Sequence, residues 1–281
     1  MIFCILKIAA KVAVCAVLAY AALSLFAYLF ADKIAFPAPK PSYNLKTDPR
    51  LKMLPTPLGA EICSIFLKNP EAQYTIIFSH GNGEDLIEIM PKLEHLHNLG
   101  FSVFAYDYFG YGQSGLKSSA KNIEACAQAA MEYLINEEKI PAKNIAIFGY
   151  SMGSAPSSFL AKKYNPRCLV LMCGFASAFQ TQTPKNLLPW DMLNNAQKLK
   201  DVHCPVLIFH GTRDCIIRHF NSEILFESAN APKFFASIKG AGHYDVPNLA
   251  PEAFYLGVKN FINTLDPQIK NAQNVEVFSQ K

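Results

Sequence analysis

The sequence predicts an α/β protein with a mostly parallel central sheet and helices on both faces of that sheet. Short apolar runs alternate with longer helical patterns through residues 58–267. Several short runs are apolar throughout rather than alternating, which is typical of strands that helices cover on both faces. The repeated order of strand and helix favours right-handed crossovers between parallel strands, and therefore one α/β domain.

The positions of the expected elements follow from these runs. Strands are expected at Ile62–Leu67, Thr75–Ser79, Ser102–Tyr106, Ile145–Phe148, Leu169–Met172, Val206–His210 and Phe234–Ile238. Helices are expected at about Glu84–Leu99, Lys121–Lys139, Met152–Tyr164, His219–Ala229 and Pro251–Thr264.

Composition limits the classes of partner and cofactor. The net charge is +4 over 281 residues, with no run of Lys and Arg and no aromatic residues interleaved with basic ones, so nucleic acid is not an expected partner. The eight cysteines include no C-x-x-C pair and the seven histidines show no ligand spacing. We therefore expect no metal site and no cofactor.

The first 32 residues have the composition of a membrane span. Val12–Ala31 is apolar or small apart from three hydroxyl-bearing side chains, and about twenty such residues cross the hydrocarbon core of a bilayer as a helix. Lys7 and Lys11 precede this run, and Asp32 and Lys33 close it. The segment 1–32 is therefore expected to be a single-pass transmembrane anchor.

Two other interpretations of this segment stay open. In a cleaved signal peptide, Ala19 and Ala21 would be the small residues of the cleavage site, but the apolar run continues ten residues beyond Ala21. The third interpretation is a buried core helix. Basic residues after the span outnumber the two lysines before it, which favours a cytoplasmic catalytic domain by the positive-inside tendency.

Two further segments flank the expected domain at 58–267. Residues 33–57 contain six prolines, which exclude a helix and predict an extended, stiff connector that lies on the domain. Residues 268–281 are polar and show no periodicity, so they are expected to form a flexible tail.

The sequence Gly-Tyr-Ser-Met-Gly at 149–153 lies between an apolar strand and an amphipathic helix. This is the context of a nucleophile elbow, a strained strand-to-helix turn that leaves room only for glycine on either side of the serine. Ser151 is therefore the candidate nucleophile. The G-x-S-x-G pentapeptide also arises by chance, so its context is what makes it informative.

A second motif, His-Gly-Asn-Gly at 80–83, directly follows the strand Thr75–Ser79. A loop at this place can turn a backbone N–H toward the nucleophile. Together with the N–H of Met152, it would bind the oxyanion of a tetrahedral intermediate. We take Asn82 as the second donor, with Gly83 as the alternative, and read His80 as a structural loop residue.

Two more strand ends supply the acid and the base. Asp214 closes the motif His-Gly-Thr-Arg-Asp after one strand, and His243 closes Gly-Ala-Gly-His after the last strand. A carboxylate at a strand end can orient the imidazole, which accepts the serine proton. The weaker candidates for the acid are Asp107, Asp191 and Asp201.

These motifs resemble those of the alpha/beta-hydrolase-domain-containing protein 17 group of the α/β-hydrolase superfamily. The matching stretches are Gly149–Gly153, His80–Asp85, Tyr106–Ser114, His210–Asp214, Gly240–His243 and, before the domain, Lys33–Tyr43. The resemblance covers about residues 33–264 and implies an α/β-hydrolase fold and the same triad positions. It also implies acyl-protein thioesterase activity, which removes palmitate from cysteine thiols of membrane proteins.

The chain departs from this group at its start. The resemblance implies a cysteine-rich, lipidated N-terminus, whereas this chain has a hydrophobic span that carries only Cys4 and Cys15. The resemblance therefore leaves open the mode of membrane attachment and, with it, the substrate.

The spacing of the strands bears on the substrate. About thirty residues separate Leu169–Met172 from Val206–His210, and a crossover helix near Met192–Leu199 takes up part of them. Little or no cap domain is therefore expected over Ser151, and the site should be fairly open. Such a site beside a membrane suits an acylated protein or a lipid better than a small metabolite.

The expected function is hydrolysis of acyl esters or thioesters through an acyl-enzyme. Within the same fold, a serine peptidase or a lysophospholipase is the alternative. A catalytically silent binding module is the alternative from another class, and the intact set Ser151, Asp214 and His243 argues against it.

Overall fold

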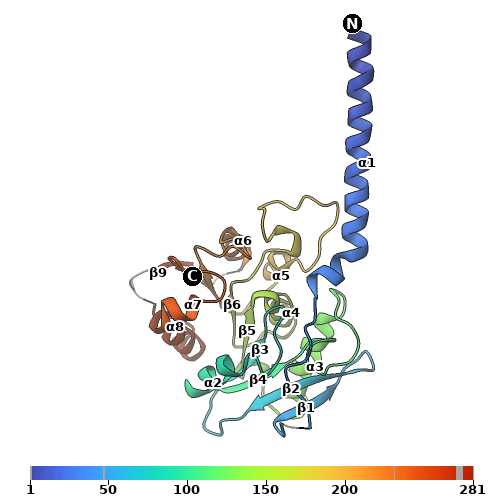
Figure 1. Cartoon of the computed structure of the whole chain (residues 1–281). Helices are drawn as coiled ribbons and strands as arrows, with labels where there is room; N and C mark the ends of the chain where they lie inside the picture. The colour runs from blue at the N-terminus through green and yellow to red at the C-terminus, as the bar shows by residue number, and fades with distance from the viewer. Residues whose placement is uncertain (1, 47, 231, 270–274, 281) are drawn as a thin grey trace.

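The computed structural model of the chain describes residues 2–46, 48–230, 232–269 and 275–280 (Figure 1). The strands in this part of the chain are β1 (Leu51–Pro55), β2 (Glu61–Leu67), β3 (Thr75–Ser79), β4 (Ser102–Tyr106), β5 (Ile145–Tyr150), β6 (Cys168–Met172), β7 (Val206–Gly211), β8 (Lys233–Ile238) and β9 (Val275–Gln280). They form one sheet in the order β1-β2-β4-β3-β5-β6-β7-β8-β9. The six strands from β4 to β8 in this order are parallel, whereas β1, β2 and β9 pair antiparallel at the two edges.

Helices cover both faces of the sheet. They are α2 (Met90–Asn98), α3 (Ile123–Asn136), α4 (Ser154–Tyr164), α5 (Asn195–Leu199), α6 (Phe220–Ser228), α7 (Val246–Leu249) and α8 (Pro251–Thr264), preceded by α1 (Ile2–Ala35). One apolar core lies between the sheet and α3 to α6, and a second lies between the sheet and α2, α7 and α8. The predicted α/β sandwich with a mostly parallel sheet is therefore confirmed.

The predicted strands and helices recur in the structure with small shifts at their ends. The largest shift is at α2, which begins at Met90 rather than at Glu84. The side chain of Asp85 accepts hydrogen bonds from the backbone N–H groups of Ile87 and Glu88, and such local bonds favour a turn over a helix.

Both flanking segments contain a strand that the sequence did not reveal. The segment 33–57 was expected to be an extended connector that lies on the domain, and within it Leu51–Pro55 forms the edge strand β1, with its proline at the strand end, where a missing N–H is tolerated. The flexible tail predicted from residue 268 is wrong for Val275–Gln280, which pairs with β8. The segment 270–274 lies outside the described residues.

Helix α1 projects from the domain at the upper right of Figure 1. It is long and apolar enough to cross a membrane from Phe3 to Ala35, and most of its side chains are exposed. It also extends three residues past the predicted end of the anchor at residue 32. The end of α1 contacts the domain closely: the N–H of Ala120 donates to Asp32 Oδ1 at 2.8 Å, and Phe36, directly after the helix, is 6% exposed.

Candidate active site

Ser151 lies at a sharp turn between β5 and α4. Its φ is +52°, in the left-handed region that non-glycine residues rarely occupy, and Ser151–Gly153 forms a short 3₁₀ turn before α4 begins. A strained backbone of this kind is typical of a nucleophile elbow. The turn lifts the serine to the carboxyl end of the central strand of the sheet.

The glycines around the serine are required by close backbone contacts. A Cβ atom on Gly153 would lie 2.0 Å from the carbonyl oxygen of Ser79, and one on Gly149 would lie 2.7 Å from the carbonyl oxygen of Gly153. These distances bring the elbow directly against the end of β3. The packing therefore leaves room only for glycine at these two positions, as the sequence predicted.

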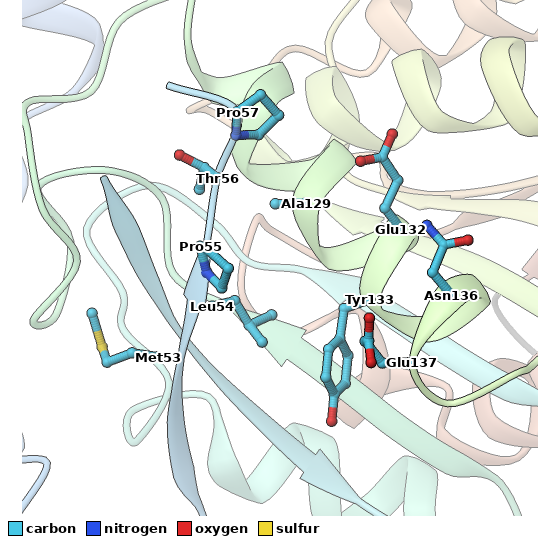
Figure 2. A pocket seen from close by; sticks show the side chains of 10 residues that line it. All are labelled: Met53, Leu54, Pro55, Thr56, Pro57, Ala129, Glu132, Tyr133, Asn136 and Glu137. Atoms are coloured by element: carbon cyan, nitrogen blue, oxygen red, sulfur yellow. The ribbon is translucent and has the colours of Figure 1, made fainter. Parts of the chain in front are cut away.

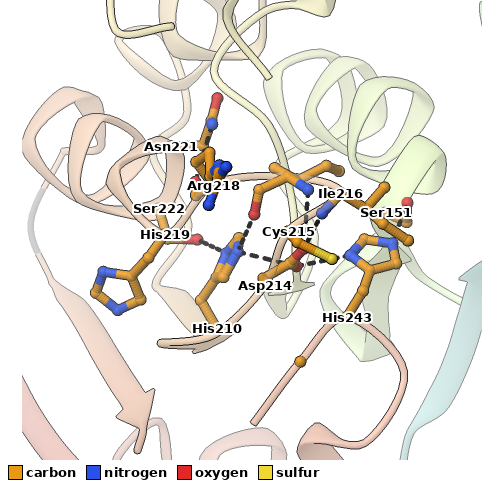
Figure 3. Close-up of polar contacts among 12 residues, drawn as sticks. Ser151, His210, Asp214, Cys215, Ile216, Arg218, His219, Asn221, Ser222 and His243 are labelled. Carbon is orange, nitrogen blue, oxygen red and sulfur yellow. Dashed lines mark hydrogen bonds and ion pairs between the residues drawn. The ribbon is translucent and has the colours of Figure 1, made fainter. Parts of the chain in front are cut away.

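The structure brings the three predicted triad residues together. The Nε2 atom of His243 is 2.9 Å from Ser151 Oγ, and its Nδ1 atom is 2.6 Å from Asp214 Oδ2. All three residues are buried, and Figure 3 shows the imidazole between the hydroxyl and the carboxylate. They come from the loops after β5, β7 and β8, which end at the same edge of the sheet.

Asp214 is held as a carboxylate. Burial alone would raise its pKa, but hydrogen bonds from His210 and His243, with help from the backbone N–H of Ile217 at 2.8 Å, keep the pKa well below its ordinary value. A carboxylate that stays ionised can orient the Nδ1–H of His243 and stabilise a positive charge on the ring.

His210 is a site residue that we did not identify from the sequence. Its Nε2 atom is 3.2 Å from Asp214 Oδ2 and 2.8 Å from the carbonyl oxygen of Ile217, and its Nδ1 atom is 2.5 Å from Ser222 Oγ. His210 is fully buried, and Figure 3 shows it on the far side of Asp214 from His243. The available signal was a polar residue at the end of an apolar strand, inside the motif already used for Asp214.

Cys173 also adjoins the triad. Its sulfur and the side-chain ligand atoms of Asp214 and His243 lie within 4.8 Å of one another. Burial raises the pKa of the Cys173 thiol well above its ordinary value, so the group is a protonated thiol at neutral pH. A metal ion would need the thiolate and would compete for the imidazole, so this cluster suits a triad better than a metal centre.

The loop His80–Gly83 starts beside the elbow, because Ser79 pairs with Gly149 in the register of β3 and β5. Asn82 and Gly83 are exposed, whereas Met152, next to the serine, is buried. Both predicted oxyanion residues therefore lie on segments that flank Ser151. The side chain of Asn82 accepts a hydrogen bond from the hydroxyl of Tyr111 and donates one to the carbonyl oxygen of Ala35 at 2.8 Å.

His80 and Asp107 form a buried pair away from the triad. The Nε2 atom of His80 is 3.3 Å from Asp107 Oδ1, and Asp107 Oδ2 accepts a hydrogen bond of 2.5 Å from the hydroxyl of Tyr43. Burial raises the pKa of Asp107, although the contacts with His80 and Tyr43 lower it in part. These contacts agree with the structural role that the sequence suggested for His80, and they pair Asp107 with His80 and Tyr43 rather than with His243.

The two other weaker candidates for the acid lie elsewhere. Asp191 is exposed and accepts hydrogen bonds from the backbone N–H of Met192 and the side chain of Asn194. Asp201 is exposed and pairs with Lys162 at 2.6 Å. Asp214 is therefore the acid that the fold brings to His243.

The segment over the site contains no helical cap. Between β6 and β7, the described residues form loops, one 3₁₀ turn at Ala178–Gln180, and the crossover helix α5. The expected absence of a cap domain is thus confirmed for this segment. The expected openness of the site is not confirmed, because Ser151 is only 7% exposed.

A groove of about 530 Å³ lies at a distance from this chemistry, between β1 and α3 (Figure 2). Residues such as Met53, Tyr133 and Glu137 line it, and no triad residue does. Because no triad residue lines this groove, we assign it no part in the proposed catalytic site.

Comparisons with known proteins bear on the family of the chain. The family model described as alpha/beta hydrolase fold matches residues 74–204. The chain is 33% identical to human Alpha/beta hydrolase domain-containing protein 17B over 77% of its own length and 85% of the relative's. It is 31% identical to Alpha/beta hydrolase domain-containing protein aho-3 of Caenorhabditis elegans, over 76% of this chain and 73% of that one.

Solved structures add a likeness in fold. An esterase from Pyrococcus furiosus superposes with a TM-score of 0.67 at 17% identity, over 82% of this chain and 96% of that one. An esterase from Exiguobacterium antarcticum superposes with a TM-score of 0.59 at 15% identity, over 76% and 99% of the two chains. By its similarity to the curated relatives, the chain is a hydrolase that belongs to the alpha/beta-hydrolase family, in the alpha/beta hydrolase domain-containing protein 17 group.

Proposed function

We propose that the chain is a serine hydrolase in which Ser151 is the nucleophile, His243 the general base and Asp214 the group that orients His243. The observation that carries this proposal is the continuous chain of hydrogen bonds from Ser151 Oγ through His243 to Asp214 Oδ2, with lengths of 2.9 and 2.6 Å. In this arrangement His243 accepts the serine proton at Nε2 while Asp214 holds the Nδ1–H tautomer.

The proposed reaction has two halves. Ser151 Oγ forms a bond to the acyl carbonyl carbon, its proton passes to His243, and His243 then protonates the leaving alcohol or thiol as the bond to that group breaks. Water then attacks the acyl-enzyme and gives a proton to His243, which passes it to Ser151 Oγ as the acyl–oxygen bond breaks, so that the fatty acid and free Ser151 are released. The backbone N–H groups of Asn82 and Met152 would stabilise the oxyanion in both halves.

The substrate class that we propose is a long-chain acyl ester or thioester on a protein or a lipid, as in a protein depalmitoylase. Large apolar side chains next to the triad support it: Ile216, two residues after Asp214, is 41% exposed, and Tyr244, next to His243, is 73% exposed. Exposed apolar groups at the mouth of a site suit an acyl chain. A lysophospholipase or a serine peptidase on the same scaffold is the alternative reaction.

We further propose that α1 is a single-pass membrane anchor and that the domain lies on the cytoplasmic side. Two contacts support a position of the site close to the membrane. The hydroxyl of Tyr20 donates to the carbonyl oxygen of Leu187 at 2.9 Å, and the rings of Tyr28 and Trp190 pack edge to face at 5.5 Å. The loop after β6 therefore runs along α1, with Leu187 67% exposed.

The decisive experiment is active-site labelling with a fluorophosphonate probe, combined with a substrate panel. The wild-type chain should be labelled, and Ser151→Ala should abolish labelling, while Ser228→Ala, a half-buried serine near the end of α6, should leave it unchanged. A folded wild-type protein that fails to react would favour a silent binding module.

Three substrates then separate the candidate reactions. An S-palmitoyl peptide, a lysophospholipid and an aminoacyl ester are compared under the same conditions. A preference for the S-palmitoyl peptide is the expected result. Faster cleavage of the lysophospholipid would favour the lysophospholipase alternative, and faster cleavage of the aminoacyl ester would overturn the proposed substrate class. Protease protection in sealed vesicles tests the side of the membrane, because a cytoplasmic domain is digested by protease added to vesicles whose cytoplasmic face is outward.

A further inference from the structure

The end of the membrane helix is bonded to the loop beside the nucleophile. The last carbonyl groups of a helix have no partner within it, and that of Ala35, the final residue of α1, accepts a hydrogen bond of 2.8 Å from Asn82 Nδ2. Asn82 lies 47 positions further along the chain, in the loop His80–Gly83. This bond joins the anchor directly to the segment that carries the proposed oxyanion donor.

A second bond fixes the other end of the same amide. The hydroxyl of Tyr111 donates to Asn82 Oδ1, and Tyr111 is fully buried in the core. The Asn82 side chain thus bridges a rigid core residue and the end of α1. An amide held at both ends restricts the backbone to which it is attached, and therefore the direction of the Asn82 N–H.

The start of the loop is held in a different way. The hydroxyl of Tyr108 donates to the carbonyl oxygen of His80 at 2.7 Å, and the two rings stack at 4.2 Å. His80 is therefore fixed by the buried core. Asn82, two residues later and exposed, takes its position from Tyr111 and from Ala35.

The end of α1 is itself well placed on the domain. Phe36 is buried in the apolar core between the sheet and α3 to α6, and its N–H donates to the carbonyl oxygen of Asp32 at 2.9 Å. Asp32 in turn accepts from the N–H of Ala120. A change in how α1 leaves the domain would thus move the acceptor that Asn82 uses.

We infer that Asn82 is a positioning residue whose side chain couples the membrane anchor to the geometry of the oxyanion site. The inference rests on the proposed function, because it assigns the backbone N–H of Asn82 to the oxyanion. It goes beyond that function in making α1 part of the catalytic architecture: the Ala35 carbonyl holds the loop in its productive position, and turnover depends on the placement of the anchor.

The test compares variants of the full-length chain in detergent micelles, each with a substitution that leaves the net charge unchanged. Asn82→Ala removes both bonds of the amide, and Tyr111→Phe removes only the bond from the core. The matched control is Asn230→Ala, another exposed asparagine whose Nδ2 atom donates to a backbone carbonyl, that of Lys200 at 2.6 Å, away from the site. For each variant, kcat, KM, the rate of fluorophosphonate labelling and the thermal unfolding midpoint are measured.

Asn82→Ala is expected to lower kcat and the labelling rate by roughly 10- to 100-fold with KM little changed, because a misplaced group near the reacting atoms costs up to about 10² in rate. Tyr111→Phe should lower both by a smaller factor, and Asn230→Ala should leave both at the wild-type level. Equal kcat values for Asn82→Ala and Asn230→Ala would overturn the inference, as would a loss confined to the unfolding midpoint.

The link to α1 is tested by adding Phe36→Ala, which loosens the contact of the anchor with the domain. In the wild-type background this change should lower kcat, whereas in the Asn82→Ala background it should have no further effect, because the bond that transmits it is gone. If Phe36→Ala lowered kcat by the same factor in both backgrounds, α1 would not act through Asn82. A wild-type chain that neither labels nor hydrolyses esters would instead contradict the proposed function, so the two failures are distinguishable.

Discussion

Asp214 lies between two imidazoles: His243 Nδ1 at 2.6 Å on the side of the nucleophile and His210 Nε2 at 3.2 Å on the opposite side. The second imidazole touches neither Ser151 nor the solvent. Its position gives it influence over the charge of Asp214, and that influence is measurable because the pKa of Asp214 is held well below its ordinary value.

Replacing His210 with Phe should therefore change how stability depends on pH. A carboxylate with a lowered pKa stabilises the fold above its unfolded pKa of about 4, and this contribution is lost as pH falls from about 5 toward the folded pKa. Without His210 the folded pKa of Asp214 rises toward its ordinary value, so less stability is lost over that range. The free energy of unfolding, measured with urea between pH 7 and pH 3, should fall less steeply with decreasing pH in His210→Phe than in the wild-type chain. The same dependence on pH in both proteins would contradict the role of His210.

The second prediction concerns the elbow. In Gly153→Ala the new Cβ would lie 2.0 Å from the Ser79 carbonyl oxygen and 2.9 Å from that of His80, and backbone atoms at the end of β3 have no room to move. Activity on an acyl ester should fall by at least about 100-fold, since a shift of about 1 Å at the site is enough for such a loss. Gly115→Ala is the control, because its Cβ would meet no atom closer than 3.5 Å. Similar activities for the two variants would rule out the close contact.

The third prediction tests how the proline-rich connector is attached. Tyr43→Phe removes the hydroxyl that donates to the buried carboxylate of Asp107 at 2.5 Å. A hydrogen bond to a charged group contributes about 1.5–3 kcal/mol, so the free energy of unfolding should fall by about that amount. Chemical denaturation of the two proteins at one pH measures this loss, and equal stability would contradict the contribution of the bond.

The triad could be predicted from the sequence because each of its members lies in the loop or turn that follows an apolar run. The carboxyl ends of parallel strands meet at one edge of a sheet, so residues such as Ser151, Asp214 and His243 converge there although up to 92 positions separate them. The order of the apolar runs along the chain therefore predicted which residues lie close together in the fold. His210, inside β7, and Cys173, directly after β6, became evident only from their distances to Asp214, because the order of the runs does not show which side chains at the strand ends face one another.

The edges of the sheet could not be predicted in the same way. Edge strands are exposed on one side and tolerate proline and polar residues, so Leu51–Pro55 looked like part of a connector and Val275–Gln280 like a tail. The hydrogen bond between Asn82 and Ala35 could also not be predicted, because no sequence pattern links the end of the first helix to the loop that contains Asn82.

The strand at the end of the chain gives the last prediction. Val275 is buried, the ring of Phe278 stacks on Phe235 at 5.7 Å, and β9 pairs with β8 along its whole length. Deleting residues 275–281 would expose the β8 edge, and the lost apolar contact and ladder bonds should lower the free energy of unfolding by about 2–4 kcal/mol. Ser279→Ala, at an exposed position of the same strand, should change it by less than about 0.5 kcal/mol. If the shortened chain unfolds at the same urea concentration as the full-length chain, β9 adds nothing to stability, and the tail would behave as its composition first suggested.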